Sequence, residues 1–370
     1  MIEFEILNRA ADGGRTGRLG TPHGSVDTPA FMPVGTYGTV RGLTPAQLSE
    51  VGVAMLLCNA YHLALRPGAE TINKLGGLHR FMGWDGPILT DSGGYQLFSL
   101  AAQVRLDERG ATFRSHLDGS EYELTPERAV DTQRDLGVDI GMVFDVLVGE
   151  PACREPAAAA AARTLRWAER TRRMIADADA TSFFAIMQGG LFDDLRRENA
   201  RALTDLDFPG YAVGGLSVGE ARDETMRTAR YAVGLLPEAK PRYMMGMGTP
   251  EDLVRLCGWG YDLFDCVIPT RNGRNGTLFT RDGEVAIRNA VHADDDSPVE
   301  RDCDCYTCSR FSRGYLHHLA KRGEMLSATL ASLHNVRFYQ RLMADIRRAL
   351  ADGDYERFAE ELTARYRREN

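Results

Sequence analysis

The chain has 370 residues, which is enough for two average domains or for one large α/β barrel. Its hydrophobic share of 44% and charged share of 26% are those of a globular protein, and no apolar run in the sequence is long enough to span a bilayer. The formal net charge of −8 excludes a surface that is basic throughout, so binding to a nucleic acid would need a local basic patch.

The first ten residues, MIEFEILNRA, lack the basic and apolar regions of a signal peptide, so we expect a cytoplasmic enzyme. The cytosol keeps thiols reduced, and the seven cysteines therefore need a role other than disulfide bonds. Residues 2–30 alternate apolar and polar side chains between glycine-rich turns, which predicts a small antiparallel sheet that acts as a lid or a plug.

From residue 30 onward, short apolar runs alternate with stretches of helical composition, several of which open with Thr-Pro or Asp as helices do. Eight strand-helix units favour a closed parallel barrel, the (β/α)8 or TIM barrel, over an open sheet. The predicted strands are residues 30–34, 54–58, 87–90, 139–144, 183–187, 211–213, 243–245 and 263–267. The predicted helices are residues 44–50, 125–136, 155–178, 193–206, 222–235 and 249–258.

Two insertions interrupt this pattern. Residues 101–124 are typical of a hairpin between the third and fourth strands, and a second insertion, which holds a cysteine cluster, follows residue 267. Helical composition returns at residues 324–351 and 355–368.

Polar and small residues follow the predicted strands, and no ordinary packing need explains that pattern. Barrel enzymes assemble their active sites at the carboxyl ends of the strands, so we expect the site there. These residues include Asn59, Asp91, Ser92, Asp145, Gln188, Gly214, Gly215 and Asp265.

The segment FDCVIPTRNGRNG, residues 264–276, places Asp265 at the exit of the eighth strand. After Pro269 the composition predicts a flexible loop that carries Arg271 and Arg274 close to this carboxylate. Guanidinium groups on such a loop suit phosphates. The alternative is a strand end followed by a solvated basic loop.

The spacing C-x-C-x-x-C predicts a metal site. Three thiolates from Cys303, Cys305 and Cys308, with one imidazole, fill a tetrahedral zinc shell and leave no position for a substrate water, so such a zinc ion would be structural. His334 is the favoured fourth ligand, and His317 and His318 are its rivals. We therefore expect one barrel domain over residues 1–370, with a zinc-binding subdomain over about residues 270–370.

Asp91 and Asp265 end the third and eighth predicted strands, beside small residues that let a substrate approach. Two carboxylates across a pocket can divide the work of breaking a glycosidic bond, one as nucleophile and the other as acid and base. Asp265 is the better nucleophile in this hypothesis, since Arg271 or Arg274 could keep it ionised.

Asp145, Gln188 and the backbone of residues 214–216 offer the acceptors and donors that read the edge of a purine-like base. Tyr95 and Met245 could sandwich its ring. Core packing is the alternative role for Tyr95 and Met245, and a helix cap is the alternative for Asp145.

With these motifs, the sequence resembles the queuine tRNA-ribosyltransferase family, the bacterial tRNA-guanine transglycosylases, over essentially its whole length. The resemblance implies a zinc-containing barrel that exchanges the wobble guanine of tRNAs with GUN anticodons for a 7-deazaguanine, in queuosine biosynthesis, through a covalent ribosyl-enzyme intermediate. The motifs that carry it are DSGGYQ (91–96), QGG (188–190), GGLSVGE (214–220), FDCVIPTRNGRNG and the cysteine cluster with its downstream histidine.

Carried onto the matching positions, the resemblance implies Asp265 as nucleophile and Asp91 as general acid and base. Arg271 and Arg274 would bind the anticodon loop, and Asn59, with Ser92, would support the catalytic carboxylates. The implied base site comprises Asp91, Ser92, Tyr95, Asp145, Gln188, Gly215, Leu216 and Met245, and the implied zinc ligands, for one zinc ion per subunit, are Cys303, Cys305, Cys308 and His334.

The family also works as a homodimer, and Phe311, Tyr315 and His318 lie at the helical spacing of its aromatic interface cluster; the alternative is an ordinary core stripe. The chain departs from bacterial members at Val146-Leu147, which stand where those members have Glu and Cys. The 7-aminomethyl precursor is the favoured base, and queuine itself, by salvage, is the alternative, because a changed pocket wall can admit a larger substituent.

Two other functions compete with this one. A catalytically silent, tRNA-binding partner subunit is disfavoured by the presence of both Asp91 and Asp265. A barrel glycosidase that acts on sugars would share the carboxylate pair but would not need the arginine segment or the zinc insertion.

Overall fold

The computed structural model describes residues 2–99, 104–115, 117–149, 153–176 and 179–367. Eight parallel strands form a closed barrel, in which the last strand pairs with the first. Nearly all their residues are buried, which explains the continuous apolar runs in the sequence. All eight predicted strands are confirmed, as β4 (Ala30–Gly35), β5 (Leu56–Cys58), β6 (Ile88–Thr90), β10 (Ile140–Met142), β11 (Ser182–Met187), β12 (Gly210–Val213), β13 (Arg242–Met244) and β14 (Leu263–Cys266).

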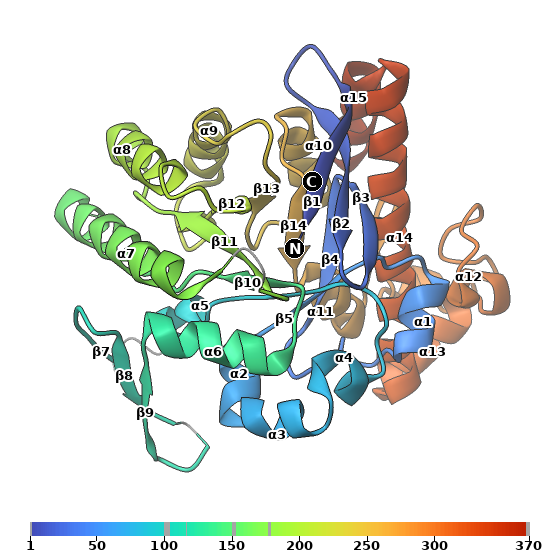
Figure 1. Ribbon diagram of the computed structural model, residues 1–370. Helices are drawn as coiled ribbons and strands as arrows, with labels where there is room; N and C mark the ends of the chain where they lie inside the picture. The colour runs from blue at the N-terminus through green and yellow to red at the C-terminus, as the bar shows by residue number, and fades with distance from the viewer. Residues whose placement is uncertain (1, 100–103, 116, 150–152, 177–178, 368–370) are drawn as a thin grey trace.

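Helices between the strands form the outer layer of the barrel (Figure 1). The six predicted helices are confirmed as α1 (Pro45–Glu50), α6 (Pro126–Leu136), α7 (Arg154–Met174), α8 (Asp193–Thr204), α9 (Arg222–Val233) and α10 (Pro250–Gly258). Four further helices of six residues each were not predicted, because such short helices show too little periodicity and, unlike α1, these do not begin at a Thr-Pro pair. They are α2 (Ala60–Leu65), α3 (Ala69–Lys74), α4 (Gly77–Met82) and α5 (Gly94–Ser99).

Three of the predicted helices begin at a Thr-Pro pair. The side chains of Thr44, Thr125 and Thr249 each accept a hydrogen bond from the backbone N–H three residues later, and the proline takes a position in the first turn. Residues 177 and 178, at the end of the predicted helix 155–178, lie outside the described residues. None of the helices in the described ranges is long and apolar enough to cross a membrane.

The N-terminal sheet closes the amino-terminal end of the barrel. Leu19 and Val26 pack with apolar residues of the barrel strands. Arg15 forms a buried, bidentate ion pair with Asp262, which directly precedes β14, at distances of 3.0 Å (Nε–Oδ1) and 2.5 Å (Nη2–Oδ2). The sheet is therefore a plug at the end opposite the strands' carboxyl ends, and it is not a lid. Its antiparallel strands are β1 (Glu3–Arg9), β2 (Arg15–Thr21) and β3 (Gly24–Thr28).

Asp139, the residue before β10, provides a second contact between this plug and the barrel. Its Oδ1 lies 2.9 Å from Nδ1 of His23, in the β2-β3 turn, and its Oδ2 lies 3.1 Å from Nε2 of His79 on α4. The two imidazole rings stack with centroids 3.6 Å apart. The backbone N–H of Ile88 also donates to Oδ2, at 2.9 Å. One buried carboxylate thus joins the plug, α4 and β6.

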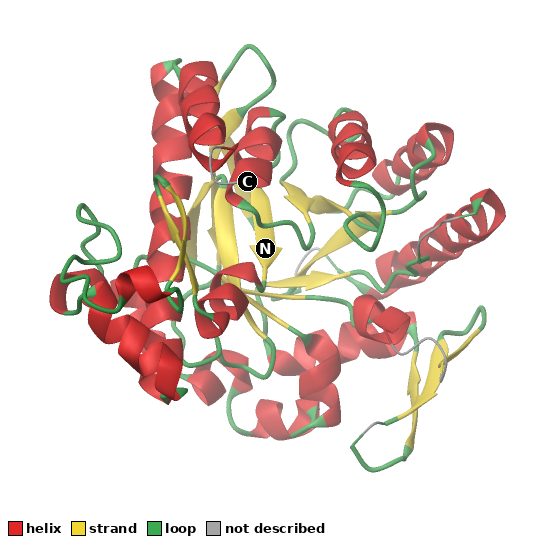
Figure 2. Cartoon of the chain, turned by 180° about the vertical axis from the view of Figure 1, so that it is seen from behind, coloured by secondary structure: helices red, strands yellow, loops and turns green. Residues whose placement is uncertain are grey.

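The first insertion has the predicted bounds but one strand more than a hairpin. It forms a three-stranded antiparallel sheet that projects away from the barrel (Figure 2), with strands β7 (Val104–Leu106), β8 (Ala111–Arg114) and β9 (Glu121–Leu124). Residues 101–103 and 116 of the predicted hairpin lie outside the described residues.

The second insertion and the C-terminal helices form the other side of the molecule. The prediction of a flexible loop after Pro269 is wrong, because Ile268–Asn275 forms helix α11. The proline lies in the first turn of this helix, and Gly276, at φ +95°, ends it. The remaining elements are β15 (Thr277–Thr280), β16 (Gly283–Ala286), the 3₁₀ helix η2 (Ala290–His292), α12 (Tyr306–Arg310), α13 (Arg313–Arg322), α14 (Met325–Asp352) and α15 (Tyr355–Arg367).

The predictions for the C-terminal helical segments are confirmed by α14 and α15, although residue 368 lies outside the described residues. α14 packs against α11 and β4 and contacts β2 of the plug. Helix α14 therefore connects the region of the metal site to the barrel and to the plug (Figure 1).

Candidate active site and metal centre

Asp91 follows β6 at the carboxyl end of the barrel and is buried. Its Oδ2 accepts hydrogen bonds from the side-chain amides of Asn59 (2.5 Å) and Gln96 (2.9 Å), and its Oδ1 accepts one from the backbone N–H of Ala60 (2.9 Å). Burial raises the pKa of Asp91, these hydrogen bonds oppose the increase, and the charge of Asp265 adds to it. The two carboxylates are thus close enough to interact.

Asp265, on β14, receives both of its hydrogen bonds on one oxygen. The hydroxyl of Tyr243 donates to Oδ1 at 2.5 Å, and the backbone N–H of Gly246 donates to it at 2.8 Å. Burial raises the pKa of Asp265, and these two donors act against it. The expectation that Arg271 or Arg274 holds Asp265 ionised is therefore wrong. The ionised form is supported by a tyrosine on the neighbouring strand and by a backbone amide.

Asp145, after β10, does not cap a helix. Its Oδ1 accepts a hydrogen bond from the hydroxyl of Ser92, and its Oδ2 accepts one from Nε2 of Gln188, both at 2.8 Å. Burial raises the pKa of Asp145 to about 6, against these hydrogen bonds and with the help of the charge of Asp91. A side chain on Gly94 would place its Cβ only 2.5 Å from Oδ1 of Asp145, so the segment after β6 needs glycine at this position.

The turn after β12 packs closely on Gln188. Gly215 has a φ of +66°, and a Cβ on it would lie 2.4 Å from Oε1 of Gln188. Glycine is therefore required at this position both for the positive φ and for the absence of a Cβ. Leu216 is buried next to it. The structure thus brings Ser92, Asp145, Gln188 and the 215–216 backbone together, as predicted.

Tyr95 and Met245 differ in exposure. Tyr95, on α5, is 57% exposed, which argues against the alternative that it is a core residue. Met245 is partly buried against the apolar interior of the barrel. The departure at Val146-Leu147 lies beside Asp145. Val146 is buried, and its backbone N–H donates to Oγ1 of Thr164 at 3.0 Å, whereas Leu147 is half-buried.

Three residues of this region were missed by the sequence analysis. Tyr243 lies inside a strand, where only its hydrogen bond to Asp265 reveals it, whereas Gln96, which donates to Asp91, stood in the quoted DSGGYQ motif. Glu220 accepts hydrogen bonds from the backbone N–H groups of Ser217 and Val218, the latter at 2.9 Å. It holds a turn in which Ser217 has a φ of +60°. Glu220 stood in the quoted GGLSVGE motif, which was the available signal.

Arg271 and Arg274 lie on α11, and among the described residues neither forms an ion pair. Burial lowers the pKa of Arg274, and the charges of Arg41 and Arg271 lower it further. Nη1 of Arg274 is buried without a hydrogen-bond partner among the described residues. Like charges that lack counterions form a patch suited to a polyanion.

Cys303, Cys305, Cys308 and His334 are buried together and can hold a metal ion. Nδ1 of His334 lies 3.8, 3.7 and 3.2 Å from the three sulfurs, in sequence order. Nε2 of His334 lies 2.8 Å from the carbonyl oxygen of Phe279, so this nitrogen carries the hydrogen and Nδ1 is left for a metal. The rival His317 instead faces the carbonyl of Ile287, at 2.8 Å. The donor set fits zinc, which favours tetrahedral sulfur and nitrogen ligands.

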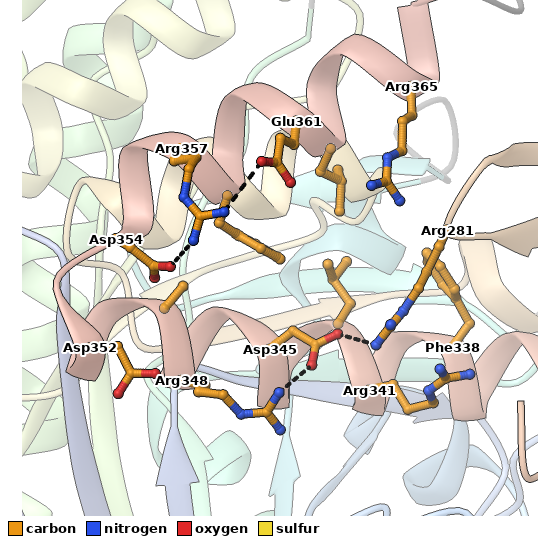
Figure 3. Close-up of a pocket in the computed structure, with 14 residues that line it drawn as sticks. Arg281, Phe338, Arg341, Asp345, Arg348, Asp352, Asp354, Arg357, Glu361 and Arg365 are labelled. Carbon is orange, nitrogen blue, oxygen red and sulfur yellow. Dashed lines mark hydrogen bonds and ion pairs between the residues drawn. The ribbon is translucent and has the colours of Figure 1, made fainter. Parts of the chain in front are cut away.

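A cavity of about 320 Å³ lies between α14 and α15, apart from these residues (Figure 3). Several of its charged groups are paired with one another, as Arg281 is with Asp345 at 2.6 Å and Arg357 is with Asp354. None of the predicted site residues lines this cavity, so it is not the candidate active site.

A closed (β/α)8 barrel with two interacting carboxylates at its mouth and a buried Cys3His group in its C-terminal region defines an enzyme built on a barrel with a metal site. The model of the family described as queuine tRNA-ribosyltransferase matches residues 11–368. The chain belongs to the queuine tRNA-ribosyltransferase family and is a pentosyltransferase.

Relatives named queuine tRNA-ribosyltransferase match nearly the whole chain. The one from Pelotomaculum thermopropionicum is 51% identical over 366 residues, which cover 99% of each chain. That from Pseudomonas putida is 50% identical over 365 residues, 98% of each chain. That from Zymomonas mobilis is 49% identical over 369 residues, which cover 99% of this chain and 95% of the relative.

Proposed function

We propose that this protein exchanges the wobble guanine of tRNAs with GUN anticodons for a 7-deazaguanine, as a tRNA-guanine transglycosylase of queuosine biosynthesis in the cytoplasm. The observation that carries the proposal is the interacting pair of carboxylates at the barrel mouth, of which Asp91 is buried and Asp265 is half-buried. Base exchange breaks one glycosidic bond and forms another at the same ribose carbon, and two carboxylates can divide that work.

Asp265 is the proposed nucleophile. Its two hydrogen bonds end on Oδ1 and favour the ionised form, so Oδ2 can attack C1′ of the ribose. The guanine leaves with the electron pair of the glycosidic bond, and a covalent ribosyl-Asp265 ester holds the tRNA. The incoming base then attacks C1′ through its ring nitrogen and releases the carboxylate.

Asp91 is the proposed general acid and base. Burial, together with the charge of Asp265, raises its pKa, which favours a protonated carboxyl beside the ionised nucleophile. The protonated Asp91 gives its proton to the departing guanine and accepts one from the incoming base. The amides of Asn59 and Gln96 hold its orientation through both steps.

We assign recognition of the base to Asp145, Gln188, Gly215 and Leu216, with Ser92 in support and Tyr95 and Met245 against its ring faces. Ionised Asp145 accepts only, which matches the two N–H donors on the guanine edge. The 7-aminomethyl base is the favoured substrate. Val146 and Leu147 beside Asp145 keep queuine as the alternative, because a changed pocket wall can admit its larger 7-substituent.

Three further assignments complete the proposal. One zinc ion per subunit would bind Cys303, Cys305, Cys308 and His334 and would cross-link the insertion to α14. Arg271 and Arg274 would contact the anticodon loop. The active form would be a homodimer. Phe311 is partly buried and stacks on Tyr315 (5.3 Å between centroids), whereas Tyr315 is 40% exposed and His318 is exposed, which supports an aromatic surface cluster over a core stripe.

The test is incorporation of labelled guanine into a tRNA with a GUN anticodon. We expect incorporation by the wild type, and a denaturation-resistant protein-tRNA adduct whose formation requires Asp265. Asp265→Asn should abolish both the incorporation and the adduct. The control is Asp27→Asn, which changes an exposed carboxylate of the plug. Asp262→Asn is unsuitable as a control, because Asp262 holds the plug to the barrel. An adduct formed by Asp265→Asn would refute the assignment of the nucleophile. Competition between the aminomethyl base and queuine decides the substrate.

A further inference from the structure

Arg196, on α8, is a completely buried arginine. Burial lowers its pKa to about 10, so it remains protonated near neutral pH. Arginines are rarely buried completely unless they are paired, yet no ion pair of Arg196 is found in the described part of the chain. Its donors go instead to two backbone carbonyls, those of Gly190 (Nε, 2.7 Å) and Gly214 (Nη2, 3.0 Å).

These two carbonyls belong to the turns that follow the neighbouring strands β11 and β12. The first turn begins with Gln188, and the second contains Gly215. The turns touch each other, since a Cβ on Gly214 would lie 2.8 Å from Nε2 of Gln188 and one on Gly215 would lie 2.4 Å from Oε1. The guanidinium of Arg196 therefore bridges the turn after β11 and the turn after β12. The relative position of these two turns decides how the amide of Gln188 lies beside the backbone of residues 215–216.

The rest of α8 supports the same turn. A Cβ on Gly189 would lie 2.8 Å from the backbone nitrogen of Arg196, so the start of the helix packs directly on this turn. Asn199, one helical turn later, accepts a hydrogen bond from the backbone N–H of Gln188 at 3.0 Å and donates to the carbonyl of Ala161, also at 3.0 Å. α8, which lies beside β11 (Figure 1), thus presents a buried polar face to residues 188–190.

A purely structural role explains Arg196 poorly. Its Nη1 is buried without a hydrogen-bond partner among the described residues, and a buried donor left unsatisfied costs stability. An apolar side chain of similar length would fill the space without burying a charge. What an apolar residue cannot do is hold two carbonyls at a fixed separation, as the planar, forked guanidinium does.

We propose that Arg196 is a positioning residue for base recognition, which sets the separation between the turn 188–190 and the turn 214–216 by clamping their carbonyls. The inference rests on the proposed function, in which Gln188 and Gly215 contact the base. Arg196 acts through these residues and does not touch the base itself.

Arg196→Lys tests this proposal, with Arg242→Lys as the matched control. Lysine keeps the charge, but its single ammonium on a flexible chain does not reproduce the fork. Arg242 is also buried, has a pKa lowered by burial to about 10, and donates to the carbonyls of Leu236 (2.7 Å) and Pro237 (3.3 Å). It begins β13, at the opposite end of the barrel from the site.

Incorporation of labelled guanine into the tRNA is measured over ranges of both substrates, together with the melting temperature. We expect Arg196→Lys to raise the KM for guanine about tenfold or more, while the KM for tRNA and the kcat at saturating guanine stay near the wild-type values. Arg242→Lys should lower the melting temperature without changing the KM for guanine. Two results would overturn the proposal. In the first, both variants lose the same stability and neither changes the KM for guanine. In the second, Arg196→Lys raises the KM for guanine and the KM for tRNA equally.

A second measurement avoids dependence on the folding of the variants. Hydrogen–deuterium exchange of the wild-type enzyme should show residues 188–190 and 214–216 gaining protection together when guanine is added, and protection of only one segment contradicts the clamp. Failure of the proposed function is recognised separately, as wild-type enzyme that labels no tRNA. The exchange experiment needs no tRNA, so it tests the coupling of the two turns separately from transfer to tRNA.

Discussion

At the scale of single residues, the ionisation of Asp145 controls what the candidate site can bind. Burial raises its pKa to about 6, so the carboxylate is ionised at neutral pH and accepts hydrogen bonds on both oxygens. As the pH falls through about 6, the carboxyl takes up a proton and offers a donor where the guanine edge requires an acceptor.

We therefore predict that the KM for guanine rises as the pH falls below about 6, approaching tenfold per pH unit. Steady-state incorporation of labelled guanine between pH 5 and pH 8 measures it. Asp145→Asn is the control, because an amide does not titrate; its KM should be high and should lose most of this pH dependence. A wild-type KM that is constant over this range contradicts the assignment.

Arg274 carries a second prediction at this scale. It lies among the like charges of Arg41 and Arg271, which a polyanionic backbone would neutralise. Arg274→Ala should weaken tRNA binding and reduce the slope of log K against log salt by about one, with little effect on the KM for guanine. Arg281→Ala is the matched control, since Arg281 is already paired with Asp345 at 2.6 Å. Equal salt slopes for both variants would show that Arg274 makes no phosphate contact.

The sequence predicted which residues gather at the site better than it predicted their partners. Asp91, Asp145 and Asp265 were found because each follows or ends an apolar run, and a barrel brings such positions to one end. The partners of Asp265 were not found, since Tyr243 looked like one more apolar strand residue. Only the pairing of β13 with β14 places its hydroxyl beside the carboxylate.

At the scale of elements, α11 shows how tertiary contacts override local composition. Asn, Gly and Arg in residues 271–276 are typical of a loop, but Asn335 on α14 donates to the carbonyls of Pro269 and Thr277, both at 2.9 Å. A Cβ on Gly273 would lie 2.9 Å from the backbone of α14, so glycine permits this close packing. The helix exists because α14 is there, which a local pattern cannot show.

A metal ion bound by the Cys3His group would cross-link the same group of elements, because these residues come from the loop before α12, from α12 itself and from α14. We predict one zinc ion per chain by elemental analysis, and removal of the metal with a chelator should lower the melting temperature by several degrees. Cys308→Ser should lose the metal. Cys153→Ser, which changes an exposed cysteine outside the cluster, should keep it. A metal-free protein with an unchanged melting curve contradicts the prediction.

At the scale of the whole molecule, the barrel was predictable and the place of the N-terminal sheet was not. The barrel strands are buried on both faces, so each leaves an apolar run in the sequence. The plug is held by contacts such as Arg15 with Asp262, which are 247 residues apart. Such a pairing leaves no local signal, and the alternation of residues 2–30 predicts a sheet without predicting the end of the barrel that it covers.

This placement makes Asp139 a determinant of acid stability for the whole molecule. Burial acts to raise its pKa, but hydrogen bonds from His79, the Ile88 N–H and His23 outweigh it and lower the pKa to about 2. A carboxylate whose pKa is lower in the folded state stabilises the fold above its unfolded pKa, and that stabilisation disappears as the pH falls from about 4 to about 2.

We predict that Asp139→Asn lowers the free energy of unfolding at pH 7 by about 2 kcal/mol and removes part of its pH dependence between about pH 4 and pH 2. Chemical denaturation at a series of pH values measures both effects. Asp27→Asn is the matched control on the same plug, where the pair with Arg18 is 54% exposed on both sides and contributes little. Equal effects of the two substitutions would mean that the plug is held by its apolar contacts and Arg15, and that the stacked histidines and Asp139 add nothing to its attachment.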